Sequence, residues 1–280
     1  MSRENLGGVA LVAMTALALL LLHPRIAHHR GWRATVTPLA SIIGSGFLVV
    51  GPLLTDVAGS WAPLAMATLC ALAGLFGMAI RYNIAHAEPL HLAPAVDTGA
   101  LRLDRTADLC LAFAYFISVA YYLNLLGAYL LKGFGVVDPT SARSATSVVV
   151  VMLGTIGLWH GFRGLERIEV AAVSLKLAVI GSVLLVLALT FLPRGSGGAV
   201  QLPHAMRETP WHALRILLGC VILVQGFETS RFLGSEYEAT LRIRSMRWAQ
   251  WLSSAIYMAF IALLLPHAPG GRPGVGAETQ

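Results

Sequence analysis

Charged residues are scarce in this sequence. Asp, Glu, Lys and Arg make up 12% of its 280 residues, where soluble domains carry about 25%, and the mean hydropathy is +0.71. The polar residues fall between apolar blocks that are long enough to cross a bilayer, which needs about 20 residues. The composition therefore argues against a soluble domain and predicts an all-α integral membrane protein in a lipid bilayer.

Cysteine and lysine are also rare. The three cysteines lie inside apolar blocks without CxxC spacing or a paired histidine, so we expect no metal, disulfide or cofactor. Lys132 and Lys176 are the two lysines, and the net charge of +6 therefore comes almost wholly from arginine. Because the arginines cluster in a few loops, we interpret them as membrane topology and expect no nucleic-acid partner.

The apolar blocks predict a leading helix and seven further spans. The leading block, Leu6–Leu22, is followed by no small-residue cleavage site, so we expect it to be retained. The further spans, numbered one to seven, are Val36–Thr55, Trp61–Tyr82, Ala107–Leu131, Thr146–His160, Ile168–Leu192, Trp211–Ser235 and Trp248–Leu265.

Loop charges predict the orientation, because cytoplasmic loops carry an excess of Lys and Arg. One face collects about twice as many cations as the other, and we assign it to the cytoplasm. Its residues are Arg25, Arg30, Arg33, Arg81, Arg102, Arg105, Arg163, Arg167, Arg242, Arg244 and Arg247. This places both termini outside, in a plasma (inner) membrane.

Span one is interrupted in its middle by Gly44, Ser45 and Gly46. Glycine is unfavourable inside a helix, and a helix opened at membrane depth exposes backbone groups that lipid cannot satisfy. In transporters such a break is where substrate binds. The alternative is close helix packing, because Thr37, Ser41 and Ser45 are spaced four apart.

Span six shows a second interruption at Gly226, next to Gln225, with Glu228 and Arg231 at or near membrane depth. A structural ion pair between Glu228 and Arg231, three residues apart, is one reading. Ionisable groups inside a span also mark functional cavities. Glycine-interrupted helices at matching positions of two halves are the sign of an inverted-repeat transporter.

These residues resemble the amino acid–polyamine–organocation (APC) superfamily of secondary transporters. The resemblance rests on Ile42–Phe47 (Ile-Ile-Gly-Ser-Gly-Phe), on Gly226–Glu228 (Gly-Phe-Glu), and on the segment from Arg163 into Lys176. It implies a five-plus-five inverted-repeat fold, here incomplete. The implied parts are a leading helix and basic loop (1–34), a first repeat (35–192), a partial second repeat (193–265) and a disordered tail (266–280).

The resemblance also implies a site for a small-molecule substrate, an amino acid or an organic amine. Hydroxyl and amide groups of the span-one break would hold the carboxylate of the substrate. Carbonyls of both breaks would hold its ammonium group, and Phe227 would border the pocket for its side chain. The implied substrate-binding residues are Ile42, Gly44, Ser45, Gly46, Ile222, Gln225, Gly226 and Phe227. Glu228 is implied in gating and Lys176 in proton coupling. For Lys176 the alternative is a side chain that snorkels to the interface.

The superfamily core has ten spans, and spans eight to ten are absent here. We therefore expect a partial transporter, and a second chain that supplies the missing spans is a candidate partner. Two other readings remain open. One is a non-transporting membrane sensor or assembly component. The other is an intramembrane serine protease, which lacks support because no mid-span histidine is available as a base for Ser45.

Overall fold

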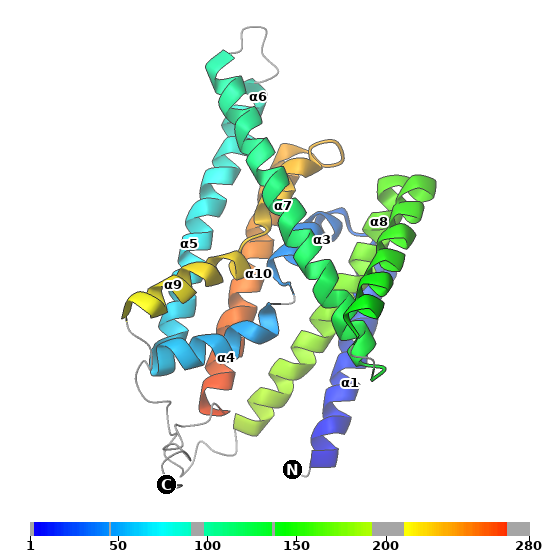
Figure 1. Ribbon diagram of the computed structural model, residues 1–280, viewed down its shortest axis with the longest axis vertical. Helices are drawn as coiled ribbons and strands as arrows, with labels where there is room; N and C mark the ends of the chain where they lie inside the picture. Colours follow the sequence, from blue (N-terminus) through cyan, green and yellow to red (C-terminus); the bar gives the residue numbers. More distant parts are fainter. Residues whose placement is uncertain (1–2, 45, 91–97, 136–137, 192–209, 268–280) are drawn as a thin grey trace. The chain divides into compact units, whose positions relative to one another are not determined.

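The computed structural model describes residues 3–44, 46–90, 98–135, 138–191 and 210–267 (Figure 1). Every regular element in these ranges is helical, which confirms the all-α class. Among the described residues, five helices are long and apolar enough to cross a membrane. They are Asn5–Leu22, Arg102–Lys132, Thr140–Gly161, Gly164–Thr190 and the run Phe47–Ala87, which contains two α-helices, Phe47–Ala58 and Ala62–Tyr82.

The chain divides into two compact units, which are described separately. The first comprises residues 1–85 and 169–280, and the second comprises residues 86–168. The helices of the first unit are α1 (Arg3–Leu22), α2 (Pro24–Ala27), α3 (Arg30–Ile42), α4 (Phe47–Ala58), α5 (Ala62–Tyr82), α9 (Pro210–Cys220) and α10 (Ala239–Leu264), with the end of α8. Short 3-10 segments are Gly59–Trp61, Val221–Val224, Phe227–Leu233 and Leu265–His267, and Asn83–Ala87 is a π-helical turn.

In the first unit, α10 is the central packing element and runs beside α3 and α5 (Figure 1). Its buried face carries Met246, Tyr257 and Phe260. The Phe47 ring lies 5.5 Å from the Tyr257 ring and 4.5 Å from the Phe260 ring. This aromatic cluster holds the start of α4 against α10, so the two parts of span one share a core with span seven.

A polar contact ties α5 to α10 on another side. The amide nitrogen of Gln250 donates to the Ala73 carbonyl at 3.0 Å, and Arg81 donates to the Gln250 amide oxygen. A Cβ at Gly77 would lie 2.0 Å from Gln250 Nε2, so a side chain at this position would displace the Gln250 amide. Gln250 thus joins α10 to both the backbone and a side chain of α5.

Span one is broken where the glycine cluster predicts. α3 ends at Ile42, whose successor Ile43 leaves the helical region with ψ 76°, and α4 begins at Phe47. The prediction of an unwound segment around Gly44–Gly46 is therefore confirmed. Each part alone is too short to cross a membrane, because α3 has 13 residues and α4 has 12.

Span six is broken in the same manner. α9 continues as the 3-10 turn Val221–Val224, Gln225 is extended, and Gly226 adopts φ 118° before Phe227–Leu233 begins. A positive φ of this size is accessible to glycine and unfavourable for other residues. The predicted interruption at Gly226–Phe227 is confirmed.

The second unit holds α6 (Glu88–Leu90), α7 (Thr98–Lys132) and the first part of α8 (Pro139–Phe191). α7 and α8 approach closely at Gly127, where a Cβ would lie 2.5 Å from the Ala142 carbonyl oxygen. Asp138 precedes α8 and accepts the Ser141 hydroxyl at 2.7 Å and the Ser141 N–H at 2.8 Å, and these bonds lower the pKa of its carboxyl. The capping carboxylate starts the helix after a short connection.

Spans four and five are separate helices, as predicted. The label α8 (Pro139–Phe191) covers two helices that meet at a kink at Gly161 (φ 62°, ψ −162°), and the candidate spans on its two sides are Thr140–Gly161 and Gly164–Thr190. A single glycine suffices because its φ lies outside the range that other residues readily adopt. Of the predicted disordered tail, residues 266–267 belong to the last 3-10 turn, and the rest lies outside the described residues. The inverted repeat and its boundaries stay predictions.

Candidate functional site

The two breaks lie against each other. A Cβ added to Gly226 would lie 2.6 Å from the backbone carbonyl carbon of Ser41 and 2.5 Å from its Oγ. Gly46 of span one lies next to span six, because a Cβ added there would lie 2.2 Å from the Leu223 side chain. Gly226 therefore permits a close approach to the backbone of span one, and Gly46 packs against a side chain of span six. The expectation that the two breaks lie side by side is confirmed.

Tyr257 of α10 joins the two breaks. Its hydroxyl lies 2.8 Å from the Leu223 carbonyl oxygen and 3.2 Å from the Ile42 carbonyl oxygen, and its side chain is 1% exposed. The hydroxyl has one hydrogen to donate between these two acceptors. Both carbonyls lie where their helices open, so Tyr257 replaces partners that a continuous helix would have provided.

The sequence interpretation did not include Tyr257. A signal was available, because a buried tyrosine in the middle of an apolar span needs a partner for its hydroxyl. The partner itself lies 34 residues away at Leu223 or 215 residues away at Ile42. No local pattern identifies a partner at such a separation.

Lys176 reaches the end of α3 from α8. Its amine donates to the Ala40 carbonyl at 3.1 Å and to the Ile43 carbonyl. The amine therefore faces the end of span one, which does not fit a side chain that snorkels to the interface. The coupling role of Lys176 stays a prediction. Two helical turns earlier on the same face of α8, Glu169 accepts the Thr37 hydroxyl at 2.8 Å. Span five therefore holds α3, the first part of span one, through two polar contacts.

Glu228 turns back toward the break of span six. Its carboxylate accepts the Gly226 N–H at 2.9 Å, and the Thr229 hydroxyl donates to the Gly226 carbonyl at 2.7 Å. The carboxylate thus stabilises the start of the 3-10 segment, where unpaired N–H groups favour a negative charge. Phe227 is 2% exposed and belongs to the hydrophobic core.

The remaining predicted substrate residues are placed as follows. Ile42 presents its carbonyl to Tyr257, while Gly44 and Gly46 border the break of span one. Gln225 and Gly226 form the break of span six. Ser45 lies outside the described residues, as does the side chain of Ile222, whose backbone is in the 3-10 turn. The binding roles of all these residues stay predictions.

We expect Tyr257→Phe to lower the free energy of unfolding by about 1–3 kcal/mol, because a buried carbonyl loses its donor. The measurement is the shift of the unfolding midpoint in mixed micelles of mild detergent and dodecyl sulfate. Tyr129→Phe is the control, since Tyr129 is 62% exposed on α7. Equal stability of the two variants would show that the hydroxyl does not hold the breaks together.

Comparison with known proteins shows the family of the chain. A family model described as "APC superfamily transporter" matches residues 24–276. The chain belongs to the APC superfamily. This APC chain is also 42% identical over 249 residues to an uncharacterized protein of Aquifex aeolicus (strain VF5). The match covers 88% of the chain and 60% of that relative, so the chain spans about 60% of the relative's length. No solved structure matches the chain.

APC membership agrees with the residues from which the resemblance was argued. It supports a location in a membrane and a role in transport over a role in catalysis. The two breaks, with Lys176 and Tyr257 bound to their carbonyls, lie within the matched residues of this APC chain.

Proposed function

We propose that the chain takes part in secondary active transport of an amino acid or a related organic amine across the plasma (inner) membrane, driven by protons. The observation that carries the proposal is the contact between two interrupted helices at Gly226 and Ser41. Backbone groups released at the two breaks converge there, and irregular backbone at membrane depth is tolerated where it is buried in protein or lines a cavity.

The polarity of the breaks suits a ligand that carries both an ammonium and a carboxylate group. α3 and the Val221–Val224 turn direct their carbonyl ends toward the breaks, whereas α4 and the Phe227–Leu233 turn begin there with N–H groups. Helix carboxyl ends favour cations and amino ends favour anions. We therefore assign the ammonium to the carbonyls of Ile42, Ile222 and Gln225, and the carboxylate to Gly44, Ser45 and Gly46.

Lys176 supplies a mechanism for proton coupling. As an ammonium it has three N–H donors, and two acceptors at the end of α3 lie within its reach. Loss of the proton removes the charge and weakens both bonds, since charged donors bind carbonyls more strongly than neutral ones. Protonation of Lys176 therefore holds the inner part of span one against span five, and deprotonation releases it.

The test is uptake of a labelled amino-acid and amine panel into proteoliposomes, with and without an inward proton gradient. The assembly used contains every chain that co-purifies with this one. We expect one ligand class to accumulate only with the gradient. Binding without accumulation in any condition would favour a sensor, and absence of binding for the whole panel would reject the substrate class.

We expect Ser45→Leu to weaken ligand binding at least about tenfold without unfolding the protein, because the substitution removes a hydroxyl donor and fills the break. Binding is measured by scintillation proximity with the labelled ligand found above. Ser147→Leu is the control, since Ser147 is exposed on α8 and an apolar side chain is tolerated there. Unchanged affinity in Ser45→Leu would contradict the carboxylate assignment.

A further inference from the structure

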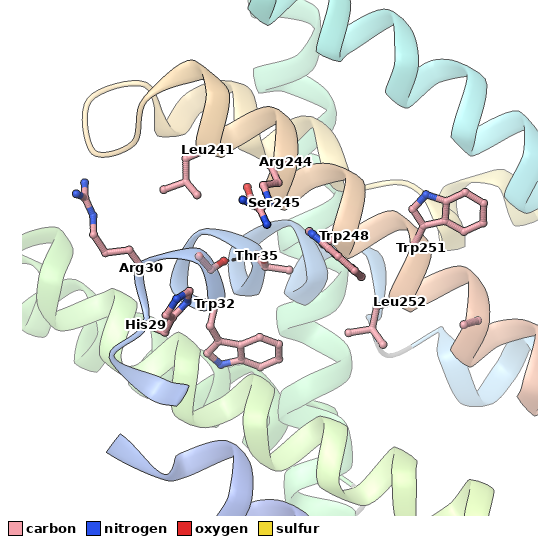
Figure 2. A pocket seen from close by; sticks show the side chains of 12 residues that line it. His29, Arg30, Trp32, Thr35, Leu241, Arg244, Ser245, Trp248, Trp251 and Leu252 are labelled. Carbon is pink, nitrogen blue, oxygen red and sulfur yellow. Dashed lines mark hydrogen bonds between the residues drawn. The ribbon is translucent and has the colours of Figure 1, made fainter. Parts of the chain in front are cut away.

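An open groove of about 1000 Å³ lies between the start of α3 and the first half of α10 (Figure 2). One part of it is lined by His29 and the cation Arg30 from the α3 side and by the cation Arg244 from α10. Further along α10, the lining continues with Trp248 and Trp251. No carboxylate is among the described residues that line the groove.

The α10 wall of the groove is one continuous face. Arg244, Trp248, Trp251 and Ala255 follow one another at intervals of four, three and four residues, which places them along one side of the helix. At a rise of about 1.5 Å per residue, this face is about 16 Å long, close to the hydrocarbon depth of one leaflet, about 15 Å. Trp248 is 61% exposed and Trp251 is 70% exposed, so the face is open to a ligand from outside the unit.

The two arginines of the groove are available to an anion. Both are exposed, and within the described part of the chain neither the Arg30 nor the Arg244 side chain forms an ion pair or hydrogen bond. The guanidinium group binds phosphate oxygens through paired N–H donors. Indole rings are favoured where the apolar and polar parts of a bilayer meet. The groove therefore has a positively charged end and an aromatic, apolar wall. These two parts match the charged head and the apolar tail of an amphipathic anion.

We propose that this groove binds one anionic phospholipid of the leaflet that α10 enters. Its phosphate lies at the end that carries Arg30 and Arg244, and an acyl chain follows Trp248 and Trp251. Basic pockets between membrane helices bind anionic headgroups on this principle. A second helix fits the face less well, because close helix contacts in membranes use small residues and this face presents two indoles. The site is independent of the transported substrate.

The test uses the full chain in vesicles of phosphatidylcholine and phosphatidylglycerol, with bromine on the acyl chains of one lipid at a time. Bromine quenches tryptophan fluorescence on contact, so the relative affinity of the two lipids follows from the two quenching curves. We expect the wild-type protein to prefer phosphatidylglycerol, and Arg30→Gln/Arg244→Gln to lose about tenfold of this preference. Trp248→Phe/Trp251→Phe should remove the phosphatidylglycerol-specific part of the quenching.

The matched control is Arg102→Gln/Arg105→Gln, which removes two exposed charges from α7 and should keep the wild-type preference. Equal quenching of the wild type by the two lipids would overturn the proposal. So would a preference that survives in Arg30→Gln/Arg244→Gln. If both lipids fail to quench Trp248 and Trp251, another protein segment fills the groove and the lipid site is rejected.

Discussion

Gly226→Ala is expected to lower the free energy of unfolding by about 2–5 kcal/mol. Gly226 has φ 118°, and holding a residue with a side chain in this region costs about 1–2 kcal/mol. The added Cβ would also lie 2.6 Å from the Ser41 backbone, and overpacking typically costs 1–3 kcal/mol. Backbone cannot move aside as a flexible side chain can, so the two breaks must separate. Unfolding in mixed micelles, followed by tryptophan fluorescence, measures the change.

Gly219→Ala is the matched control for this prediction. Gly219 lies in α9, seven residues earlier, and a Cβ there meets nothing within 4 Å. Alanine is favoured over glycine inside a helix by up to about 1 kcal/mol, so this variant should be as stable as the wild type or more stable. If Gly226→Ala were as stable as Gly219→Ala, the close contact between the two breaks would be disproved, and the proposed site would lose its basis.

Lys176→Ala is expected to abolish the dependence of uptake on the proton gradient while ligand binding persists. The substitution removes the donor for the Ala40 and Ile43 carbonyls, and with it the group that gains and loses the proton. Uptake in proteoliposomes with a gradient should fall to the level seen without one. Binding measured by scintillation proximity should remain close to that of the wild type, because the ligand is assigned to other backbone groups.

Two further lysine variants separate coupling from packing. Lys176→Arg keeps the positive charge but cannot release a proton, so we expect binding with slow, gradient-independent turnover. Lys132→Ala removes the other lysine, which is exposed at the end of α7, and should transport like the wild type. Wild-type gradient-driven uptake in both Lys176 variants would end the proton-coupling proposal and leave Lys176 as a structural tie between spans one and five.

The polar contacts around the breaks explain how an open turn is held in a fold with a large apolar core. The carbonyls of Ala40, Ile42 and Ile43 are each within reach of a donor, from Lys176 or from Tyr257. These donors come from α8 and α10, so the end of span one is held between spans five and seven. A movement of either helix would change the partners of the break, as the proposed transport cycle requires.

Several features of this protein follow from its sequence alone. Apolar length and low charge predicted the helical membrane class, because a bilayer requires about 20 apolar residues for each crossing. Gly44, Gly46 and Gly226 predicted where spans one and six open, because the cost of glycine inside a helix acts at the residue itself. Membership of the APC superfamily was predicted from the order of these same segments.

Other features were decided only by tertiary structure. The sequence did not predict that Tyr257 binds the carbonyls of both breaks, or that Gln250 joins α5 to α10. It predicted two separate spans here, but not that a kink at the single residue Gly161 divides them. The sequence predicted a role for Lys176, but not its two acceptors, the Ala40 and Ile43 carbonyls, because these depend on the packing of α8 against α3. The physical reason is common to these cases: helix length and helix breaks are local properties, whereas the partner of a buried polar group depends on residues far apart in the chain.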